Sequence, residues 1–395
     1  MKNAAPLTGI TVLAIEQAIA APLCTRQLAE LGARVIKIER PGTGDFARHY
    51  DDRVKGLSSH FVWTNRSKQS LTLDLKQPEA LQIVRRLLAS TDVLVQNLAP
   101  GAVERMGLAY QSLQAEFPRL ICCDISGYGA SGSYASKKAY DLLLQAEAGL
   151  LTVTGTATDM AKSGISIADI AAGMQAHSAI LAALIQRGNT GRGSQICVSL
   201  LEAMVEWMGY PLYYAYEGAE PPPRTGSDHA TIFPYGAFAT GDEQLLMLGL
   251  QNEREWQVFC REILEDESLA SDSRFCGNPQ RSANRAQLRA IIEEKFSACS
   301  VADIKRKLDA ARIACADVNE LSRVWAHPQL QEMERLSSFS SPVGTLRGFL
   351  PPASNSEFEH TLSAVPALGE HTEKILQELG YGETDCARLR ADAVI

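Results

Sequence analysis

The sequence lacks the features that mark several large classes of protein. Its 38 Lys and Arg residues are outnumbered by 46 Asp and Glu, and no basic stripe interrupts this acidic balance, so nucleic acid is not an expected partner. No apolar run reaches about 18 residues, the length that spans a bilayer, so we expect no membrane span. The first residues, Met1–Pro6, contain no signal-peptide core. These absences favour a cytoplasmic protein.

Disulfide and metal frameworks are also missing. The nine cysteines are an odd number, lie scattered along the chain and form no C-x-x-C pair. Such a pattern predicts reduced thiols of a cytoplasmic protein. The seven histidines show no metal-ligand spacing, so no metal site is expected.

A third absence concerns the first predicted β-α-β unit. We predict a strand at Ile10–Ile15, a helix at Pro22–Leu31 and a strand at Val35–Glu39. The turn between the first strand and the helix contains no Gly-x-Gly-x-x-Gly, which a dinucleotide pyrophosphate needs for close approach to the backbone. A dehydrogenase is therefore disfavoured, although Glu39 stands where a ribose-binding acid would.

Strands and helices go on alternating as far as about residue 215. This alternation predicts an α/β domain, with a parallel sheet between two layers of helices. The Pro-rich stretch Gly218–Pro223 then marks a linker. Beyond it, a predicted hairpin around Gly241–Asp242 and several helices indicate a smaller α+β domain.

Asp169 is the most informative single residue. It opens a predicted helix in the apolar run Ile165–Met174, with no basic residue beside it. An Asp at this point is commonly an N-cap. A carboxylate at the positive end of a helix is also expected to stay ionised and available as a nucleophile. The two roles are compatible.

Short motifs follow one another in a characteristic order along nearly the whole chain. They are Gly9–Leu13, Ala20–Pro22, Leu31–Gly42, Gly44–Asp45, Asn65–Lys76, Pro100–Leu108, Pro118–Ile121, Ser126–Gly129, Tyr140–Asp141, Thr190–Gly193, His327–Leu330 and Pro366–Thr372. Each motif is loose, but their order and spacing together resemble the class III coenzyme A transferases, the superfamily of formyl-CoA transferase, carnitine-CoA transferase and α-methylacyl-CoA racemase.

The resemblance implies an architecture. The large CoA-binding domain would be Rossmann-like, formed by residues 1–215 and completed by 331–395, and residues 216–330 would hold the small domain and its linkers. Members are similar in forming interlocked homodimers. They use coenzyme A thioesters and small carboxylic acids as substrates, with no permanently bound cofactor.

The resemblance also implies a mechanism and a site. Asp169 matches the aspartate that attacks an acyl-CoA, passing through a mixed anhydride and an aspartyl-CoA thioester. Gln17 and Ala18 match the turn near the thioester, although simple loop packing is the alternative for Gln17. Basic residues after strands or in adjacent loops suit the phosphates of coenzyme A, each with a solvated surface charge as the alternative. These residues are Arg40, Arg66, Lys68, Arg105 and Lys138.

Tyr140 separates the branches of the superfamily. The racemase branch has a His at the position of Tyr140, directly before the residue that matches Asp141. A His suits the exchange of a Cα proton near neutral pH and a Tyr does not. Tyr140 is instead expected to pack or to hydrogen-bond near the acyl site.

The stretch Thr225–Tyr235 bears on the acceptor acid. It lacks the glycine run of the formyl-CoA transferases and looks more like the succinyl-CoA:dicarboxylate transferases, whose acceptors include glutarate, mesaconate, itaconate and malate. Arg224 and His229 are candidates for a distal carboxylate, with an ordinary loop histidine as the alternative for His229. We therefore predict a succinyl-CoA:dicarboxylate CoA-transferase. An acyl-CoA racemase or isomerase and a non-catalytic CoA-ester-binding protein are the alternatives.

Overall fold

The computed structural model describes residues 4–360 and 362–395, and this part of the chain divides into two compact units. The large unit contains the chain up to Ala148 together with Ser163–Gly209 and Gln329–Ile395. The small unit contains Gly149–Lys162 and Tyr210–Pro328. The segment Gly149–Lys162 was placed in the first domain by the sequence. In the structure the chain leaves the large unit after Ala148, and the following Gly149, with a φ of +84°, ends the preceding helix.

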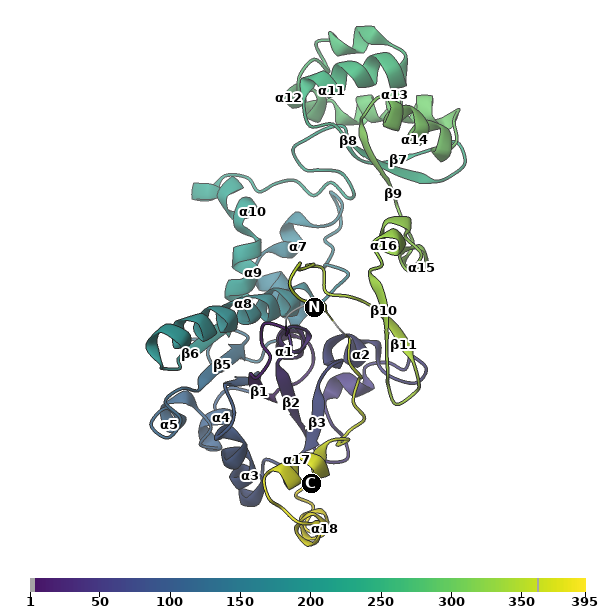
Figure 1. The fold of residues 1–395 in the computed structure, drawn as a ribbon. Coiled ribbons are helices and arrows are strands. Elements are labelled where there is room, and N and C mark those ends of the chain that lie inside the picture. Colours follow the sequence, from purple (N-terminus) through teal and green to yellow (C-terminus); the bar gives the residue numbers. More distant parts are fainter. Residues whose placement is uncertain (1–3, 361) are drawn as a thin grey trace. The chain divides into compact units, whose positions relative to one another are not determined.

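A parallel sheet forms the centre of the large unit (Figure 1). Among the described residues its six strands lie in the order β3-β2-β1-β4-β5-β6, and each neighbouring pair is parallel. This is the strand order of doubly wound sheets, whose ligands bind beyond the carboxyl ends of the strands. The strands are β1 (Thr11–Ile15), β2 (Arg34–Glu39), β3 (Gln69–Thr72), β4 (Val93–Gln96), β5 (Ile121–Ser126) and β6 (Gln195–Ser199).

Helices cover both faces of this sheet. In the large unit they are α1 (Ala20–Glu30), α2 (Ser59–Asn65), α3 (Pro78–Leu88), α4 (Ala102–Arg105), α5 (Tyr110–Leu113), α6 (Asp141–Glu147), α8 (Ile167–Thr190), α9 (Leu200–Trp207), α17 (Thr372–Glu378) and α18 (Glu383–Ala391). A short helix, η1 (Phe46–His49), follows β2, and the hairpin β10 (Leu336–Phe339) and β11 (Leu346–Phe349) follows α16 (Pro328–Glu332).

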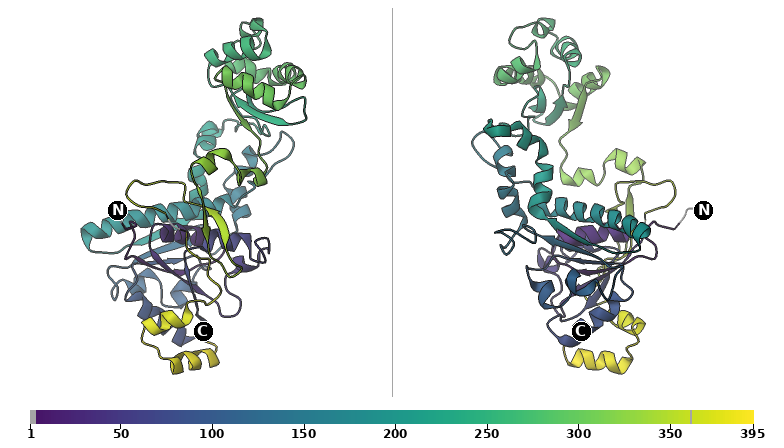
Figure 2. Two further views of the ribbon diagram at one scale, coloured as in Figure 1. Left: turned by 45° about the vertical axis from the view of Figure 1, so that its right-hand side comes forward. Right: turned by 90° about the vertical axis from the view of Figure 1, so that its left-hand side faces the viewer.

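One face is covered by α3 and by the C-terminal helices α17 and α18, which are yellow in Figure 2. The apolar residues of α3 recur at helical spacing, so that Ala80, Ile83, Val84 and Leu87 all point into the core. They pack there with Leu13 and the other inward residues of the strands.

The opposite face carries α1 and α8, which cross closely at Gly173. A Cβ atom on Gly173 would lie 2.6 Å from the carbonyl oxygen of Ala20, so only glycine fits at this crossing. Asp169 therefore lies one helical turn before the crossing, beside the start of α1. By length and composition α8 could also cross a membrane. Its packing against α1, β5 and β6 is that of the core helix of a globular unit.

The small unit is an α+β unit with its own apolar core. The antiparallel strands β7 (Tyr235–Ala239), β8 (Leu245–Gly249) and β9 (Ala314–Asp317) pack against helices through Phe238, Trp256 and Phe296. Its helices and short helical turns are α7 (Leu150–Val153), α10 (Gly209–Tyr214), η2 (Tyr216–Gly218), α11 (Glu253–Val258), η3 (Phe259–Leu264), η4 (Glu267–Ala270), α12 (Asn278–Ala283), α13 (Arg285–Ser297), α14 (Val301–Ala310) and α15 (Leu321–Val324). The predicted α/β class with a parallel sheet is confirmed.

Candidate functional site

The turn between β1 and α1 lies at the carboxyl edge of the sheet, where ligands of such sheets bind. Its backbone is fixed by Asn97, the residue that follows β4: the Gln17 N–H donates to Asn97 Oδ1 at 2.8 Å, and Asn97 Nδ2 donates to the Gln17 carbonyl at 2.8 Å. The Gln17 side chain reaches the segment after β2, where its Oε1 accepts from the Phe46 N–H at 3.4 Å. The predicted pair Gln17 and Ala18 is therefore held rigidly at this edge.

Ala18 has an uncommon backbone conformation for a residue with a side chain, with φ at +63°. Its N–H donates to Asp45 Oδ1 at 2.9 Å. Asp45 is 1% exposed, and its other oxygen contacts Lys37 Nζ at 2.6 Å. A buried ion pair thus lies directly behind the turn.

Asp169 lies in the first turn of α8, but it does not open the helix as predicted. Ser166 is the N-cap residue, and Asp169 stands three positions further on. The helix is capped from outside by Asp141, whose Oδ1 accepts from the N–H groups of Ala168 at 2.8 Å and Asp169 at 3.3 Å. Gln145 holds the other Asp141 oxygen at 2.7 Å. The expectation that Asp169 is an N-cap was wrong, because Asp141 takes its place.

The carboxylate of Asp169 is partly buried and has no hydrogen-bond partner among the described residues. Burial, reinforced by the negative charge of Asp141, raises its pKa from 3.8 to about 7. The expectation that Asp169 stays ionised is therefore corrected, because a pKa of about 7 leaves part of this carboxyl group protonated near neutral pH. A raised pKa also makes the ionised form a stronger base and a stronger nucleophile.

Tyr50 links Asp169 to the turn. Burial raises the pKa of the Tyr50 hydroxyl, and the nearby negative charges of Asp45 and Asp169 raise it further, as does Tyr140. Asp45, Asp169 and Tyr140 therefore all lie within electrostatic reach of Tyr50. Tyr140 precedes α6 and is 70% exposed, so it is available to a ligand on this side of the unit.

The five predicted basic residues fall into two groups. Arg40, Arg105 and Lys138 are exposed, after β2, in α4 and before α6. Arg66 and Lys68 are buried instead, with 8% and 3% exposure. Each already has an acidic partner at 2.6 Å, Glu30 and Glu16 respectively. These two side chains are therefore structural in this fold and do not present a free cation to a phosphate.

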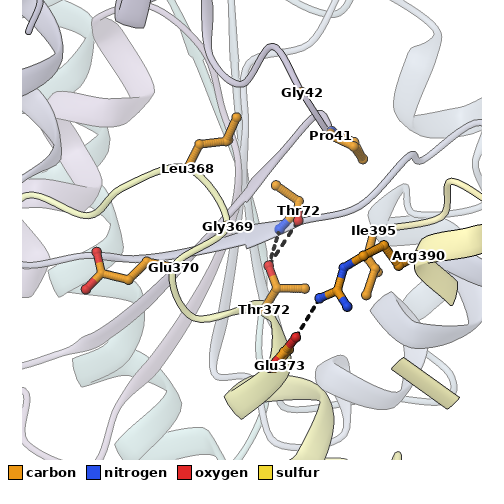
Figure 3. Close-up of a pocket in the computed structure, with 10 residues that line it drawn as sticks. All are labelled: Pro41, Gly42, Thr72, Leu368, Gly369, Glu370, Thr372, Glu373, Arg390 and Ile395. Atoms are coloured by element: carbon orange, nitrogen blue, oxygen red, sulfur yellow. Dashed lines mark hydrogen bonds and ion pairs between the residues drawn. The ribbon is translucent and has the colours of Figure 1, made fainter. Parts of the chain in front are cut away.

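A pocket of about 370 Å³ opens at the carboxyl ends of β2 and β3 (Figure 3). In Figure 3 Thr72 and Thr372 are joined by hydrogen bonds, and Arg390 pairs with Glu373 at 2.5 Å. Pro41 lines the pocket directly after Arg40, but none of the predicted site residues does.

His229 belongs to the small unit. Its Nδ1 accepts from the N–H groups of Thr231 at 3.2 Å and Ile232 at 3.1 Å, so the proton of the neutral ring is on Nε2. The ring stacks on Tyr235 with centroids 5.3 Å apart. The guanidinium of Arg224 donates to the carbonyls of Thr156 and Ala157. The Nε2–H of His229 can therefore donate to a ligand, whereas two of the N–H groups of Arg224 already donate to backbone carbonyls.

Several residues of this site were missed from the sequence, namely Lys37, Asp45, Tyr50 and Asn97. Asp45 was part of a quoted motif, Gly44–Asp45, but nothing in the motif shows that its carboxylate reaches back to Ala18. Among the described residues, no group of three or more His, Cys, Asp or Glu is arranged to hold a metal ion.

Comparison with known proteins gives one consistent result. The model of the family "CoA-transferase family III" matches residues 7–372. Succinyl-CoA:glutarate CoA-transferase of Homo sapiens is 32% identical over 400 residues, covering 100% of this chain and 91% of that protein. Formyl-CoA:oxalate CoA-transferase of Shigella sonnei is 30% identical, covering 99% of both chains.

A solved structure has the same fold over almost the whole length. A CAIB/BAIF family protein from Brucella suis superimposes with a TM-score of 0.85 at 32% identity, covering 95% of this chain and 100% of that one.

Proposed function

The chain belongs to CoA-transferase family III, and on this premise we propose that it moves coenzyme A from succinyl-CoA to a small dicarboxylate of the glutarate, mesaconate, itaconate or malate type. It is an enzyme of the transferase type, and its substrates are coenzyme A thioesters and carboxylic acids, with no permanent cofactor. The choice of acids and the role of individual residues are the proposal.

The observation that carries the mechanism is the state of Asp169. Its carboxylate is partly buried, has no hydrogen-bond partner among the described residues and has a pKa of about 7. It lies beside a rigid turn at the edge of the sheet where ligands bind. An acid that served only to stabilise a helix would take up the N–H groups of the first turn. Here Asp141 takes them, so the Asp169 oxygens stay free to react.

The proposed reaction begins with attack of a carboxylate oxygen of Asp169 on the thioester carbon of succinyl-CoA. The carbon–sulfur bond breaks, leaving a mixed anhydride and the coenzyme A thiolate. The thiolate attacks the Asp169 carbonyl carbon, which forms an aspartyl-CoA thioester and releases succinate. The acceptor carboxylate then attacks this thioester, and the expelled thiolate attacks the acceptor's acyl carbon. The products are the new acyl-CoA and the regenerated Asp169 carboxylate.

Other residues receive supporting roles. Arg40, Arg105 and Lys138 are proposed to meet the phosphates of coenzyme A, because their cations are exposed near the carboxyl ends of the strands. Gln17 and Ala18 would contact the thioester region, and Tyr140 the acyl group. His229 is proposed to donate from Nε2 to the distal carboxylate of the acid.

Racemisation is the alternative within the superfamily. The exposed Tyr140 argues against it, because a racemase needs two groups that exchange protons near neutral pH. Incubating an acyl-CoA in deuterated water without acceptor acid separates the two reactions: a racemase places deuterium at Cα and a transferase does not.

An interlocked homodimer and a cytoplasmic location complete the proposal. Large apolar side chains are exposed on each unit, Ile185 at 71% and Tyr213 at 79%, and a second copy of the chain would cover them. All nine cysteines are free thiols in the described structure, as in reducing compartments. If the dimer is interlocked, tagged and untagged dimers mixed under native conditions should not exchange subunits.

The transfer is tested by mixing the enzyme and succinyl-CoA with glutarate, mesaconate, itaconate, malate and oxalate, one at a time, and identifying the thioesters by mass. We expect exchange with a dicarboxylate of four to six carbons. With hydroxylamine present, the hydroxamate should appear on Asp169, and it should be absent in Asp169→Asn but present in the exposed control Asp309→Asn. Absence of exchange with every acid would sink the proposed substrate class.

A further inference from the structure

Four charged side chains are buried together beneath the β1–α1 turn. They are Glu16, Lys37, Asp45 and Lys68, and none is more than 3% exposed. We call them the turn network. Lys37 Nζ lies 2.6 Å from Asp45 Oδ2 and 3.3 Å from Glu16 Oε1, and Lys68 Nζ lies 2.6 Å from the same Glu16 oxygen. The two acids and two lysines balance in charge.

The network is saturated with partners. Lys68 Nζ also donates to the carbonyl of Pro22 at 2.9 Å and to Asn65 Oδ1 at 3.1 Å. The second oxygen of Glu16 accepts from Thr25 Oγ1 at 2.7 Å. No donor of Lys68 remains for a ligand, so the network acts on the protein itself.

Charge compensation sets the protonation of its members. Burial alone raises the pKa of Glu16, but the charges of Lys68 and Lys37 bring it below its usual value. Burial lowers the pKa of Lys68 to about 8, although Glu16 opposes this shift. Glu16 and Lys68 are therefore both charged near neutral pH and hold together as an ion pair.

One member reaches the active-site turn. Asp45 Oδ1 accepts from the N–H of Ala18 and from the N–H of Ala47, each at 2.9 Å. Ala18 is the residue with φ at +63°, a conformation that persists only where its surroundings impose it. The Asp45 carboxylate, which Lys37 holds in place, accepts directly from this residue, while Asn97 holds the neighbouring Gln17.

Stability alone does not account for this arrangement. Buried ion pairs are often replaced by apolar residues with no loss of stability, so four buried charges are an inefficient way to hold a core together. They do fix geometry, since each ion pair and hydrogen bond has a narrow range of distance and angle.

We propose that the turn network is a positioning device, in which Lys37 and Asp45 hold the Gln17–Ala18 turn in the shape that receives the thioester next to Asp169. This inference rests on the proposed function. Asp45 and Lys37 are positioning residues: they act through the backbone of Ala18 and do not touch the substrate.

The test compares Asp45 with another buried acidic residue that is also in an ion pair but does not contact the β1–α1 turn. Glu30 is 5% exposed and contacts Arg66 at 2.6 Å, so Glu30→Gln breaks a buried ion pair without touching the turn network. Asp45→Asn keeps an oxygen that can accept from Ala18 but loses the charge, and Asp45→Ala loses both. Each variant is measured for thermal midpoint, for kcat and KM with succinyl-CoA, and for the single-turnover rate of hydroxamate formation on Asp169.

We expect Asp45→Ala to lower kcat by about 100-fold, the cost of a misplaced reacting group, and Asp45→Asn to lower it by about tenfold. Glu30→Gln should lower the thermal midpoint by a similar amount while kcat, measured well below that midpoint, changes by less than about twofold. The hydroxamate rate should fall in the order of kcat.

The inference fails if Asp45→Asn and Glu30→Gln lower the thermal midpoint equally and also lower kcat by the same factor. It also fails if Asp45→Asn keeps full activity. Should Asp45→Ala not fold, Asp45→Asn decides, because it preserves the shape of the side chain. A wild-type enzyme that transfers no CoA and forms no hydroxamate contradicts the proposed function instead.

Discussion

Two groups of acids flank the start of α1, and the protein treats them in opposite ways. Glu16 and Asp45 are buried with lysine partners, and the pKa of Glu16, which burial alone would raise, falls below its ordinary value because of Lys68 and Lys37. Asp169 lies beside another acid, Asp141, and the described residues offer neither of them a Lys or Arg partner. Burial and the Asp141 charge raise its pKa to about 7.

The difference shows what makes a buried acid reactive. A carboxylate with a lysine is stable as an anion and fixes geometry. Asp169, which has no lysine partner, keeps its basicity and its free oxygens, at a cost in stability. The variants below break one group or the other.

Asp169→Asn should have the largest effect. It removes the proposed nucleophile, so we expect kcat to fall by about 10⁴-fold or more. The same change should stabilise the fold at pH 8. Because the folded pKa of about 7 lies above 3.8, the native state binds more protons than the unfolded state between these values, and stability is lost as pH rises through that window. Asn does not ionise and avoids the loss.

The measurement is the thermal midpoint of both proteins at pH 5 and pH 8, beside the transfer assay. The gain of Asp169→Asn over the wild type should be a few degrees at pH 8 and smaller at pH 5. If the variant is inactive but its gain in thermal midpoint is the same at both pH values, the pKa of Asp169 is not raised in the folded protein.

Lys37→Met breaks the compensated group. It leaves Glu16 and Asp45 with one lysine between them, and an unpaired buried charge costs about 3–5 kcal/mol. Adding Asp45→Asn to this variant should recover part of the loss, because the unpaired charge is removed. Calorimetry of the single and double variants measures both effects.

The control for Lys37→Met is Lys305→Met in the small unit. Lys305 pairs with Asp317 at 2.9 Å, but both side chains are about one-third exposed. Such a pair contributes about 0–1 kcal/mol. Equal destabilisation by the two substitutions would mean that the turn network is not held by its charges.

Asp141→Asn separates the influence of Asp141 on Asp169 from that of burial. Removing the neighbouring negative charge lowers the pKa of Asp169, while burial, the larger cause, remains. We expect the acidic limb of kcat/KM to move down by about one pH unit, so that the variant is relatively more active at pH 6. Tyr50 also lies nearby, and its raised pKa keeps its titration above this range.

Glu147→Gln is the matched control, because Glu147 is an acid of the same helix that pairs with Lys137. Its acidic limb should stay where the wild type has it. A limb that does not move in Asp141→Asn would assign the raised pKa to burial alone.

Much of this site was readable from the sequence, for physical reasons. The strands were visible as apolar runs, and the position of Asp169 before a long apolar helix was correct to within three residues. The buried partners were not readable. Arg40 directly follows the strand β2 and Lys68 directly precedes the strand β3, yet Lys68 is 3% exposed and Arg40 lies at the surface. Burial of a lysine depends on acids far away in sequence, such as Glu16.

Two further features could not be predicted from the sequence, for related reasons. Asp45 contacts Ala18 across 27 residues, and no local pattern encodes such a contact. Helix α18 has only Cys386 and Leu389 buried, so its sequence has almost no amphipathic period to detect. What a sequence shows best is periodicity, and these features have none.

Arg40→Ala should give the smallest effect and sharpens the contrast between exposed and compensated cations. Arg40 is exposed, so its loss should leave the thermal midpoint unchanged and raise the KM for succinyl-CoA by about fivefold, the loss of one charge-assisted contact. With succinyl-pantetheine, a donor that lacks the nucleotide and its phosphates, the KM should not change.

Lys68→Met should have the opposite pattern of effects. It should lower the thermal midpoint and reduce the rate of transfer from both donors equally, because Lys68 is bound to Glu16 and Pro22 and not to the substrate. If Lys68→Met instead raised the KM only for succinyl-CoA, the donor that carries phosphates, Lys68 would have to become exposed when the substrate binds, and it would belong to the coenzyme A site.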